Sequence, residues 1–287
     1  MDISIDTLIE QSGTPVSLPE VFRKINRLTQ DPNSSMADIS QITEKDIGLS
    51  SRLLQIVNSP YFGFPSSINS IARAITIIGT HDLRDLLLTT TTVDLLANKE
   101  HKQTNIRQLW KHSLYCAVIS KLLAESLQQE HTECYFVSGL LHDVGRFILF
   151  RGIPETTHSA INHACDNGQD LLNIERSLLG YTHTDIGRRI AEHWKLPERV
   201  IETIAYHHQP ELAQHYPLET AIIHIANHIA NSFENEDESA ENNTSRINSY
   251  AWKTSGLAME NINEVLNKVP EQFNELYDLL LPAVQAA

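Results

Sequence analysis

Imidazole side chains lie on the apolar faces of four predicted helices, and this pattern restricts how the helices can pack together. In the helix around LWKHSLYCAVISKLL, one histidine shares a face with Cys116, Ile119 and Leu123. An adjacent His-Asp pair lies within the apolar sequence LLHDVGR, and helical spacing also places histidines inward in HTDIGRRIAEHW and PERVIETIAYHHQ. The inward-facing polar residues are His112, His142, Asp143, His183, His207 and His208.

These residues raise the question of a shared metal site. A single buried histidine is explained most simply by a hydrogen bond to a backbone carbonyl. Five imidazoles and one carboxylate are harder to satisfy with one another, because a neutral imidazole offers only one donor. A cation that accepts their lone pairs would resolve the problem. From the residue types alone, a metal site and separate core histidines both remain open.

Helical periodicity predicts an all-α fold, because apolar residues recur every three or four positions along most of the chain. No strand-like alternation flanks Thr89–Thr92, so this run is assigned to the end of a helix. Ser17 is a predicted N-cap, Gly79 a predicted helix end and Pro270 a predicted break in the last helix. The predicted parts are an N-terminal helical part (1–100), a helical core (101–233), an acidic loop (234–249) and C-terminal helices (250–287).

The charge balance disfavours some classes of partner. The formal net charge is −14, from 36 acidic and 22 basic residues, which opposes direct contact with a nucleic-acid backbone. No segment reaches the roughly 20 apolar residues of a membrane helix, and MDISIDTLIEQSG lacks the basic start and apolar core of a signal peptide. The three cysteines show no close pairing, which fits a reducing compartment. We therefore predict a cytoplasmic protein that contacts neither nucleic acid nor membrane.

Several ordered motifs resemble a known family. LWKHSL, LLHDVGR, ERSLLGYTHTDIG, HWKLPERVIETIAYHHQP and AIIHIANHIA are similar to the HD superfamily of metal-dependent phosphohydrolases. The N-terminal stretches EKDIGLSSRLLQIVNSPYFGFP and INSIARAITIIGTHDLRDLLL resemble more closely its HDOD branch, the HD-related output domain of bacterial signalling proteins. The resemblance covers roughly residues 15–235. It implies an HD-superfamily helical bundle with an N-terminal helical subdomain.

The resemblance also implies a ligand set. In it, His112 matches the first histidine of the superfamily, and His142 with Asp143 matches its defining pair. The extra histidines of the related two-metal HD-GYP branch, which hydrolyses cyclic di-GMP, match His183, His207 and His208. The implied cofactor is a divalent metal (iron, manganese or zinc) as one or two ions, or none if the site has decayed. In the active relatives the aspartate bridges the metals, and a metal-bound water becomes the nucleophile.

The sequence departs from the active members of this superfamily in three ways. Asn227 stands where the last metal ligand is an aspartate, and its amide oxygen brings no charge. The sequence HHQPELAQHYP lacks the Gly-Tyr-Pro motif of the cyclic di-GMP enzymes. Arg146 replaces a common lysine, which keeps a cation but changes its shape. Asp143 would then be the only matched carboxylate of a two-metal site, which predicts weaker retention of metal.

The resemblance and its departures lead to two hypotheses. The first is a non-catalytic or weakly catalytic signalling module, which acts through protein partners and whose pocket holds a metal, a nucleotide or a phosphate. The second is an active phosphohydrolase on a phosphomonoester, nucleotide or cyclic dinucleotide, with Asp143 and Arg146 as catalytic residues. Two other features each allow two interpretations. His224 and His228 in HIANH have a spacing that could chelate a metal, but we favour a solvated or hydrogen-bonded polar face; NSPYFGFP could bind a partner, but we favour a role in pinning two helices together.

Overall fold

The computed structural model describes residues 3–31, 33–96, 104–234 and 245–280. Over these ranges the chain consists of helices joined by turns and contains no strand, so the all-α prediction is confirmed. None of the helices described is both long and apolar enough to cross a membrane. The predicted boundary near residue 100 and most of the predicted acidic loop fall on 97–103 and 235–244, which lie outside the described residues.

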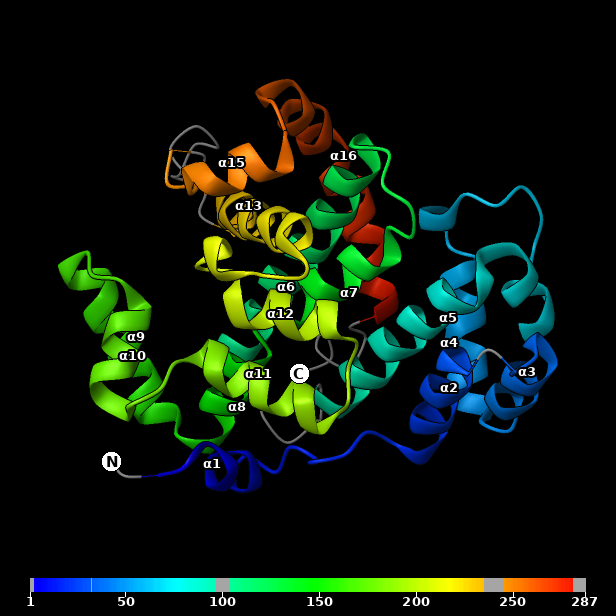
Figure 1. Cartoon of the computed structure of the whole chain (residues 1–287), viewed down its shortest axis with the longest axis horizontal. Coiled ribbons are helices and arrows are strands. Elements are labelled where there is room, and N and C mark those ends of the chain that lie inside the picture. Colours follow the sequence, from blue (N-terminus) through cyan, green and yellow to red (C-terminus); the bar gives the residue numbers. More distant parts are fainter. Residues whose placement is uncertain (1–2, 32, 97–103, 235–244, 281–287) are drawn as a thin grey trace.

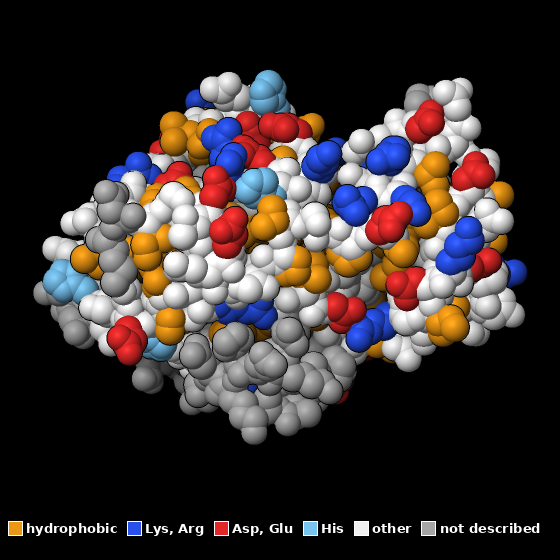
Figure 2. All heavy atoms as spheres, turned by 90° about the horizontal axis from the view of Figure 1, so that it is seen from below, with side chains coloured by type: hydrophobic (Ala, Val, Ile, Leu, Met, Phe, Trp, Pro, Cys, Tyr) orange, Lys and Arg blue, Asp and Glu red, His pale blue; other side chains and the backbone are white. Residues whose placement is uncertain are grey.

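The N-terminal helices form a lobe beside the rest of the molecule (Figure 1). Viewed from below, a hollow in the surface sets this lobe off, and Lys and Arg side chains gather beside the hollow (Figure 2). Gly79, with φ 86° and ψ 166°, interrupts the last helix of the lobe, as its sequence predicted. The lobe contains α2 (Glu20–Gln30), α3 (Met36–Glu44), α4 (Ile47–Val57), the 3₁₀ helix η1 (Pro60–Phe62) and α5 (Ile71–Leu96).

The first helix, α1 (Ile5–Gln11), lies apart from this lobe and packs against two helices of the core, α8 and α11 (Figure 1). Arg189 on α11 donates hydrogen bonds of 2.8 and 2.9 Å to the two carboxylate oxygens of Asp6. The core helices are α6 (Thr104–Ser126), α7 (Glu133–Leu141), α8 (Val144–Gly152), α9 (Pro154–Asn167), α10 (Leu171–Leu179), α11 (His183–His193), α12 (Glu198–Tyr206), the 3₁₀ helix η2 (Pro210–Leu212) and α13 (Pro217–Glu234).

The C-terminal helices α15 (Ser249–Ser255) and α16 (Met259–Leu280) pack on α13 and α6 respectively. The predicted break at Pro270 is wrong, because α16 continues through it. Proline removes one backbone donor, but the apolar face of α16 is buried on both sides of it, at Val265 and Phe273 for example, and this packing holds the helix together. The predicted N-cap at Ser17 is also wrong: α2 begins at Glu20, without a side-chain cap.

The NSPYFGFP segment attaches the N-terminal lobe to the core. The ring of Tyr61 meets that of Phe136 on α7 edge to face, with centroids 5.8 Å apart. Lys121 of α6 places its Nζ 3.9 Å from the centre of the Tyr61 ring and 2.6 Å from Glu133 Oε1. The structure therefore supports the interpretation that these aromatics pin helices together.

Candidate metal centre

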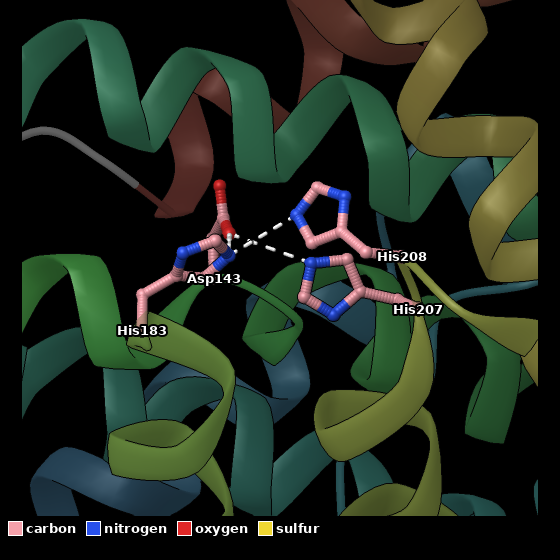
Figure 3. A group of neighbouring side chains, drawn as sticks. All are labelled: Asp143, His183, His207 and His208. Atoms are coloured by element: carbon pink, nitrogen blue, oxygen red, sulfur yellow. Dashed lines mark hydrogen bonds and ion pairs between the residues drawn. The ribbon is translucent and has the colours of Figure 1, made fainter. Parts of the chain in front are cut away.

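The polar centre forms where the ends of several helices converge. His142 is the C-cap of α7 and Asp143 the N-cap of α8, so the chain turns at this pair. His183 is the first residue of α11, and His207 is the C-cap of α12, with His208 next in the chain. Figure 3 shows three of these imidazoles pointing toward the carboxylate of Asp143.

Hydrogen bonds fix the orientation of three imidazoles. The Nδ1–H of His142 donates to the carbonyl oxygen of Gly139 at 2.7 Å, and that of His207 donates to Ile204 O at 2.9 Å. In His183, Nδ1 lies 2.8 Å from a carboxylate oxygen of the buried Glu175 and donates to it. In His142 and His207 the Nε2 lone pair is then left to face the centre, as in metal-binding histidines, whereas Nε2 of His183 lies 3.1 Å from Nε2 of His208.

These nitrogens surround the carboxylate of Asp143. Its Oδ1 lies 3.4 Å from His183 Nε2 and 3.7 Å from His207 Nε2, and its Oδ2 lies 3.5 Å from His142 Nε2. Within the part of the chain that is described, His142 Nε2, His207 Nε2 and Asp143 Oδ1 are buried without a hydrogen-bond partner. Unpaired buried lone pairs are costly, and a cation between them would satisfy all three.

The ligand atoms fall into two adjoining groups that share Asp143. One group contains Asp143, His183, His207 and His208, and the other contains His112, His142 and Asp143; within each group the potential ligand atoms lie within 4.8 Å of one another. The donor set therefore fits one or two divalent ions. In the second group, His112 Nε2 lies 2.9 Å from Asn227 Oδ1, so the amide stands beside this half of the centre without adding charge.

Burial and neighbouring charges favour the metal-binding protonation states of Asp143, His142 and His207, but not that of His183. Burial by itself would raise the pKa of Asp143, but Arg146 and the surrounding imidazoles hold it well below its usual range. Burial lowers the pKa of His142 to about 4 and that of His207 well below its ordinary value. In His183 burial acts in the same direction, but the carboxylate of Glu175 outweighs it and raises the pKa. At neutral pH, Asp143 is thus an ionised carboxylate, and His142 and His207 are neutral imidazoles that can donate a lone pair to a metal ion.

Glu175 is the buried residue that sequence reasoning missed. One of its carboxylate oxygens accepts hydrogen bonds from both the backbone N–H and Nδ1–H of His183, each at 2.8 Å. A signal was present in LLNIERSLL, because Glu175 is four residues from both Leu171 and Leu179 and so shares the apolar face of its helix. Because an acidic residue on an apolar helix face becomes buried, its carboxylate requires a hydrogen-bond donor in the interior.

Two further residues near the centre, Arg146 and His224, are engaged in hydrogen bonds. Arg146 Nη1 donates to Asp143 Oδ2 at 2.8 Å, so this cation is already engaged with the centre. His224 donates from Nδ1 to the backbone oxygen of His207 and accepts from Asn248 N–H at Nε2, at 2.7 and 3.0 Å. Both nitrogens of His224 are therefore occupied, which supports the prediction of a hydrogen-bonded polar face.

A pocket of about 680 Å³ opens beside the centre and includes His112 and Arg146 in its wall. Its other residues include Lys111, the amides of Asn105, Gln108, Asn162 and Asn231, and the stacked rings of Tyr115 and Phe233. No acidic residue is among those described in its lining, although the chain carries 36 acidic residues. Positive charge and amide groups without carboxylates suit an anionic ligand.

Solved structures with the same fold come from several bacteria. An HDOD domain protein with unknown function from Geobacter sulfurreducens is 24% identical, with a TM-score of 0.74 over 97% of this chain and 100% of that one. A candidate phosphohydrolase from Shewanella amazonensis SB2B is 23% identical, with a TM-score of 0.74 over 95% and 97%. At these identities the likeness shows the fold alone.

A curated relative, an uncharacterized protein from Treponema pallidum (strain Nichols), is 26% identical over 212 residues. These residues make up 73% of this chain and 41% of the relative, so the chain spans less than half of that protein. The family model of the HDOD domain matches residues 16–210, a region that holds the N-terminal lobe and the cluster from His112 to His208. The chain therefore belongs to the HDOD domain family.

Proposed function

We propose that this protein is a regulatory HDOD module of bacterial signalling, whose His-Asp centre binds a divalent cation and which hydrolyses phosphate esters weakly or not at all. The proposal of a metal rests on three buried atoms without hydrogen-bond partners, which converge at Asp143: His142 Nε2, His207 Nε2 and Asp143 Oδ1. The observation against strong catalysis is Asn227, which leaves Asp143 as the one carboxylate in either ligand group.

The adjoining pocket supports a phosphate-bearing ligand, such as a nucleotide, for this centre. Arg146 and Lys111 supply positive charge, and the surrounding side-chain amides can form hydrogen bonds with the polar groups of a nucleobase. The same pocket is the observation that favours the alternative function, an active phosphohydrolase. A bound divalent cation would supply the Lewis acid that activates water in such an enzyme. Arg146 would hold the phosphate, and the buried imidazoles would exclude bulk water from the centre.

We propose that the regulatory state passes to protein partners in the cytoplasm, since the net charge of −14 disfavours nucleic acid. In this role, occupancy of the centre fixes the relative positions of the helix ends that carry its ligands. The ends of α7, α8, α11 and α12 all reach the centre, so their packing depends on whether its buried lone pairs are satisfied.

Metal analysis of the full chain, purified without chelator or affinity-tag metal, tests the centre. We expect near-stoichiometric iron, manganese or zinc in the wild type and its loss in Asp143→Ala and in His208→Gln. The exposed His215, outside the cluster, provides the control variant His215→Ala, which should retain the metal. Circular dichroism establishes that each variant is folded. Absence of metal from the wild type after supplementation would overturn the metal-binding proposal.

Turnover assays distinguish the two functions. Phosphomonoester, nucleotide and cyclic-dinucleotide substrates should be hydrolysed slowly or not at all by the metal-loaded wild type. Substantial turnover that is abolished by Asp143→Ala would establish the phosphohydrolase and overturn the regulatory proposal.

A further inference from the structure

A second cavity, of about 280 Å³, lies at the boundary between the N-terminal lobe and the core. It shares no described lining residue with the pocket beside the metal centre. Helix α5, which extends from the N-terminal lobe toward the core in Figure 1, contributes one wall, and the start of α12 contributes another. The lining residues are His81, Arg84, Asp85, His131, Pro197, Arg199 and Tyr216.

Arg199 is the cation in this cavity that has no hydrogen-bonded carboxylate among the described residues. Its guanidinium is partly buried, and Nη1 has the Cys134 Sγ as its acceptor, at 2.9 Å. Burial raises the pKa of Cys134 to about 12, so the thiol remains neutral and a weak acceptor. The ring of Tyr216 lies 5.6 Å away, and Arg199 forms no ion pair with a carboxylate of the described residues. Several of its five N–H donors are therefore free to bind a ligand.

Of the carboxylates near the cavity, Asp85 is held by a neighbouring arginine. Arg84 donates two hydrogen bonds to Asp85 Oδ1, from Nε at 2.8 Å and from Nη2 at 2.7 Å. Asp82 Oδ1 lies 3.4 Å from Nδ1 of His131, whose ring is 5.9 Å from that of His81. Asp85 and Glu219 attract the guanidinium of Arg199 at longer range, but no described hydrogen bond or ion pair joins either carboxylate to it.

We propose that this cavity is a binding site for a small phosphate-type dianion, with Arg199 as its main anchor and His81, His131 and Tyr216 as further hydrogen-bonding groups. A guanidinium offers parallel donors that match two phosphate oxygens. The volume suits inorganic phosphate or the phosphate group of a small metabolite, and both sources share this chemistry.

The site has a direct structural connection to the metal centre. Helix α12 carries Arg199 in its first turn and ends at His207, and α7 carries Cys134 in its first turn and ends at His142. The two helices pack against each other, and nine helical residues span roughly 14 Å. An anion bound at Arg199 therefore contacts α5 on one side and, on the other, helices whose far ends hold candidate metal ligands. The cavity thus also provides a route by which a phosphate would influence the centre.

Isothermal titration of the full chain with inorganic phosphate, at constant ionic strength with chloride as the balancing anion, tests this site. We expect saturable binding that weakens at least tenfold in Arg199→Gln. Arg176→Gln, which removes a mainly exposed arginine elsewhere, should leave the affinity unchanged. Arg146→Gln, in the separate pocket beside the metal centre, identifies any phosphate that binds there instead. A phosphomonoester titrated in parallel distinguishes the sources, since preference for it over inorganic phosphate would indicate a metabolite.

Three results would overturn the proposal: no saturable binding, equal affinity in the wild type and Arg199→Gln, or loss of binding in Arg146→Gln alone. The last result would locate the phosphate at the metal centre. If Arg199→Gln does not fold, as judged by circular dichroism, His81→Gln replaces it, and unchanged affinity in that variant is equally contradictory. The outcome is independent of metal content, so this proposal and the metal-centre proposal can fail separately.

Discussion

At the residue scale, Asn227 determines how much negative charge the centre contains. Its amide oxygen lies 2.9 Å from His112 Nε2, at the side of the cluster where His112 and His142 meet Asp143. Two divalent ions would bring four positive charges to a centre with a single carboxylate. Charge count is a main determinant of affinity for hard cations.

The substitution Asn227→Asp should therefore tighten the binding of divalent metal by about tenfold or more, which corresponds to roughly 1.4 kcal/mol. The measurement is competition with a metal-binding dye for Mn²⁺ or Zn²⁺. Asn231→Asp is the matched control, because it adds the same charge to the same helix but outside the ligand groups. Equal gains in the two variants would show that general electrostatics, rather than ligation, sets the affinity.

Glu175 determines the orientation of His183, since one carboxylate oxygen binds both the backbone and the ring N–H groups. Glu175→Gln keeps the shape but removes the charge, and loss of such a partner commonly reduces metal affinity by about 10- to 100-fold. We expect a reduction of that order in chelator competition. Glu192→Gln, at an exposed pair with Arg188, should have no effect. Wild-type affinity in Glu175→Gln would rule out a positioning role.

At the element scale, the centre depends on how closely α8 approaches α11. Gly145 lies just after Asp143, and a Cβ there would collide with the carbonyl oxygen of His183 and lie 2.8 Å from Gly187 N. Both obstacles are backbone atoms, which cannot move without separating the helices. A side chain at position 145 would thus displace Asp143 from His183.

Gly145→Ala should destabilise the fold by about 1–3 kcal/mol or more through overpacking. Gly48→Ala is the control: its new Cβ would meet Asp46 Oδ1 at an ordinary 3.5 Å, and alanine favours the helix by up to ~1 kcal/mol. Denaturant unfolding of both variants measures the difference. If Gly145→Ala is as stable as the wild type, α8 and α11 are not packed as closely as described.

At the scale of the whole molecule, the N-terminal lobe contacts the core at a buried ion pair between two core helices, α6 and α7. The side chains of Lys121 and Glu133 are 8% and 6% exposed, and their charged atoms lie 2.6 Å apart beneath the rings of Tyr61 and Phe62. The rings of η1 therefore pack on a charge that is almost fully buried.

Lys121→Ala should cost about 3–5 kcal/mol of unfolding free energy, because it leaves Glu133 buried without a countercharge. In Lys268→Ala, which removes an exposed pair with Glu264, the cost should be below about 1 kcal/mol. Urea unfolding followed by circular dichroism provides both values. A small effect in Lys121→Ala would mean that solvent reaches Glu133.

The buried histidines make the stability of the metal-free protein depend on pH. Burial lowers the pKa of His142 and His228 to about 4 and holds those of His207 and His208 well below the ordinary value near 6.5. The unfolded chain then binds more protons below pH 6.5, so these groups contribute stability above that pH and lose it as the pH falls toward 4. His183 has a raised pKa and acts in the opposite direction.

These histidines together should contribute a loss on the order of 2–4 kcal/mol per pH unit around pH 5, at about 1.4 kcal/mol per proton, which the raised pKa values of the buried carboxyls of Asp85 and Glu133 partly offset. Denaturant unfolding of chelator-treated protein between pH 7.5 and 4.5 measures this slope. His228→Gln should reduce it, whereas His215→Gln, at an exposed position, should not. Constant stability over this range would contradict the described burial.

The sequence by itself determined the helical class and the main polar residues of the centre. Apolar spacing of three and four residues is a local property, and an imidazole or carboxylate on such a face must be buried wherever the helix packs. The structure brings together His112, His142, Asp143, His183, His207 and His208, as the sequence predicted, and their role as metal ligands remains a prediction. The family match likewise depends on motifs that follow one another in a fixed order along the sequence.

Only the tertiary structure decided how charges pair across long separations in the chain. Sequence could not show that Lys121 meets Tyr61, or that Arg199 faces a cavity with a thiol as its acceptor. It also predicted a break at Pro270, where packing on both sides keeps the helix continuous. The physical reason is the same in each case: the free energy of a buried group depends on the neighbours that folding brings to it, and these come from distant parts of the chain.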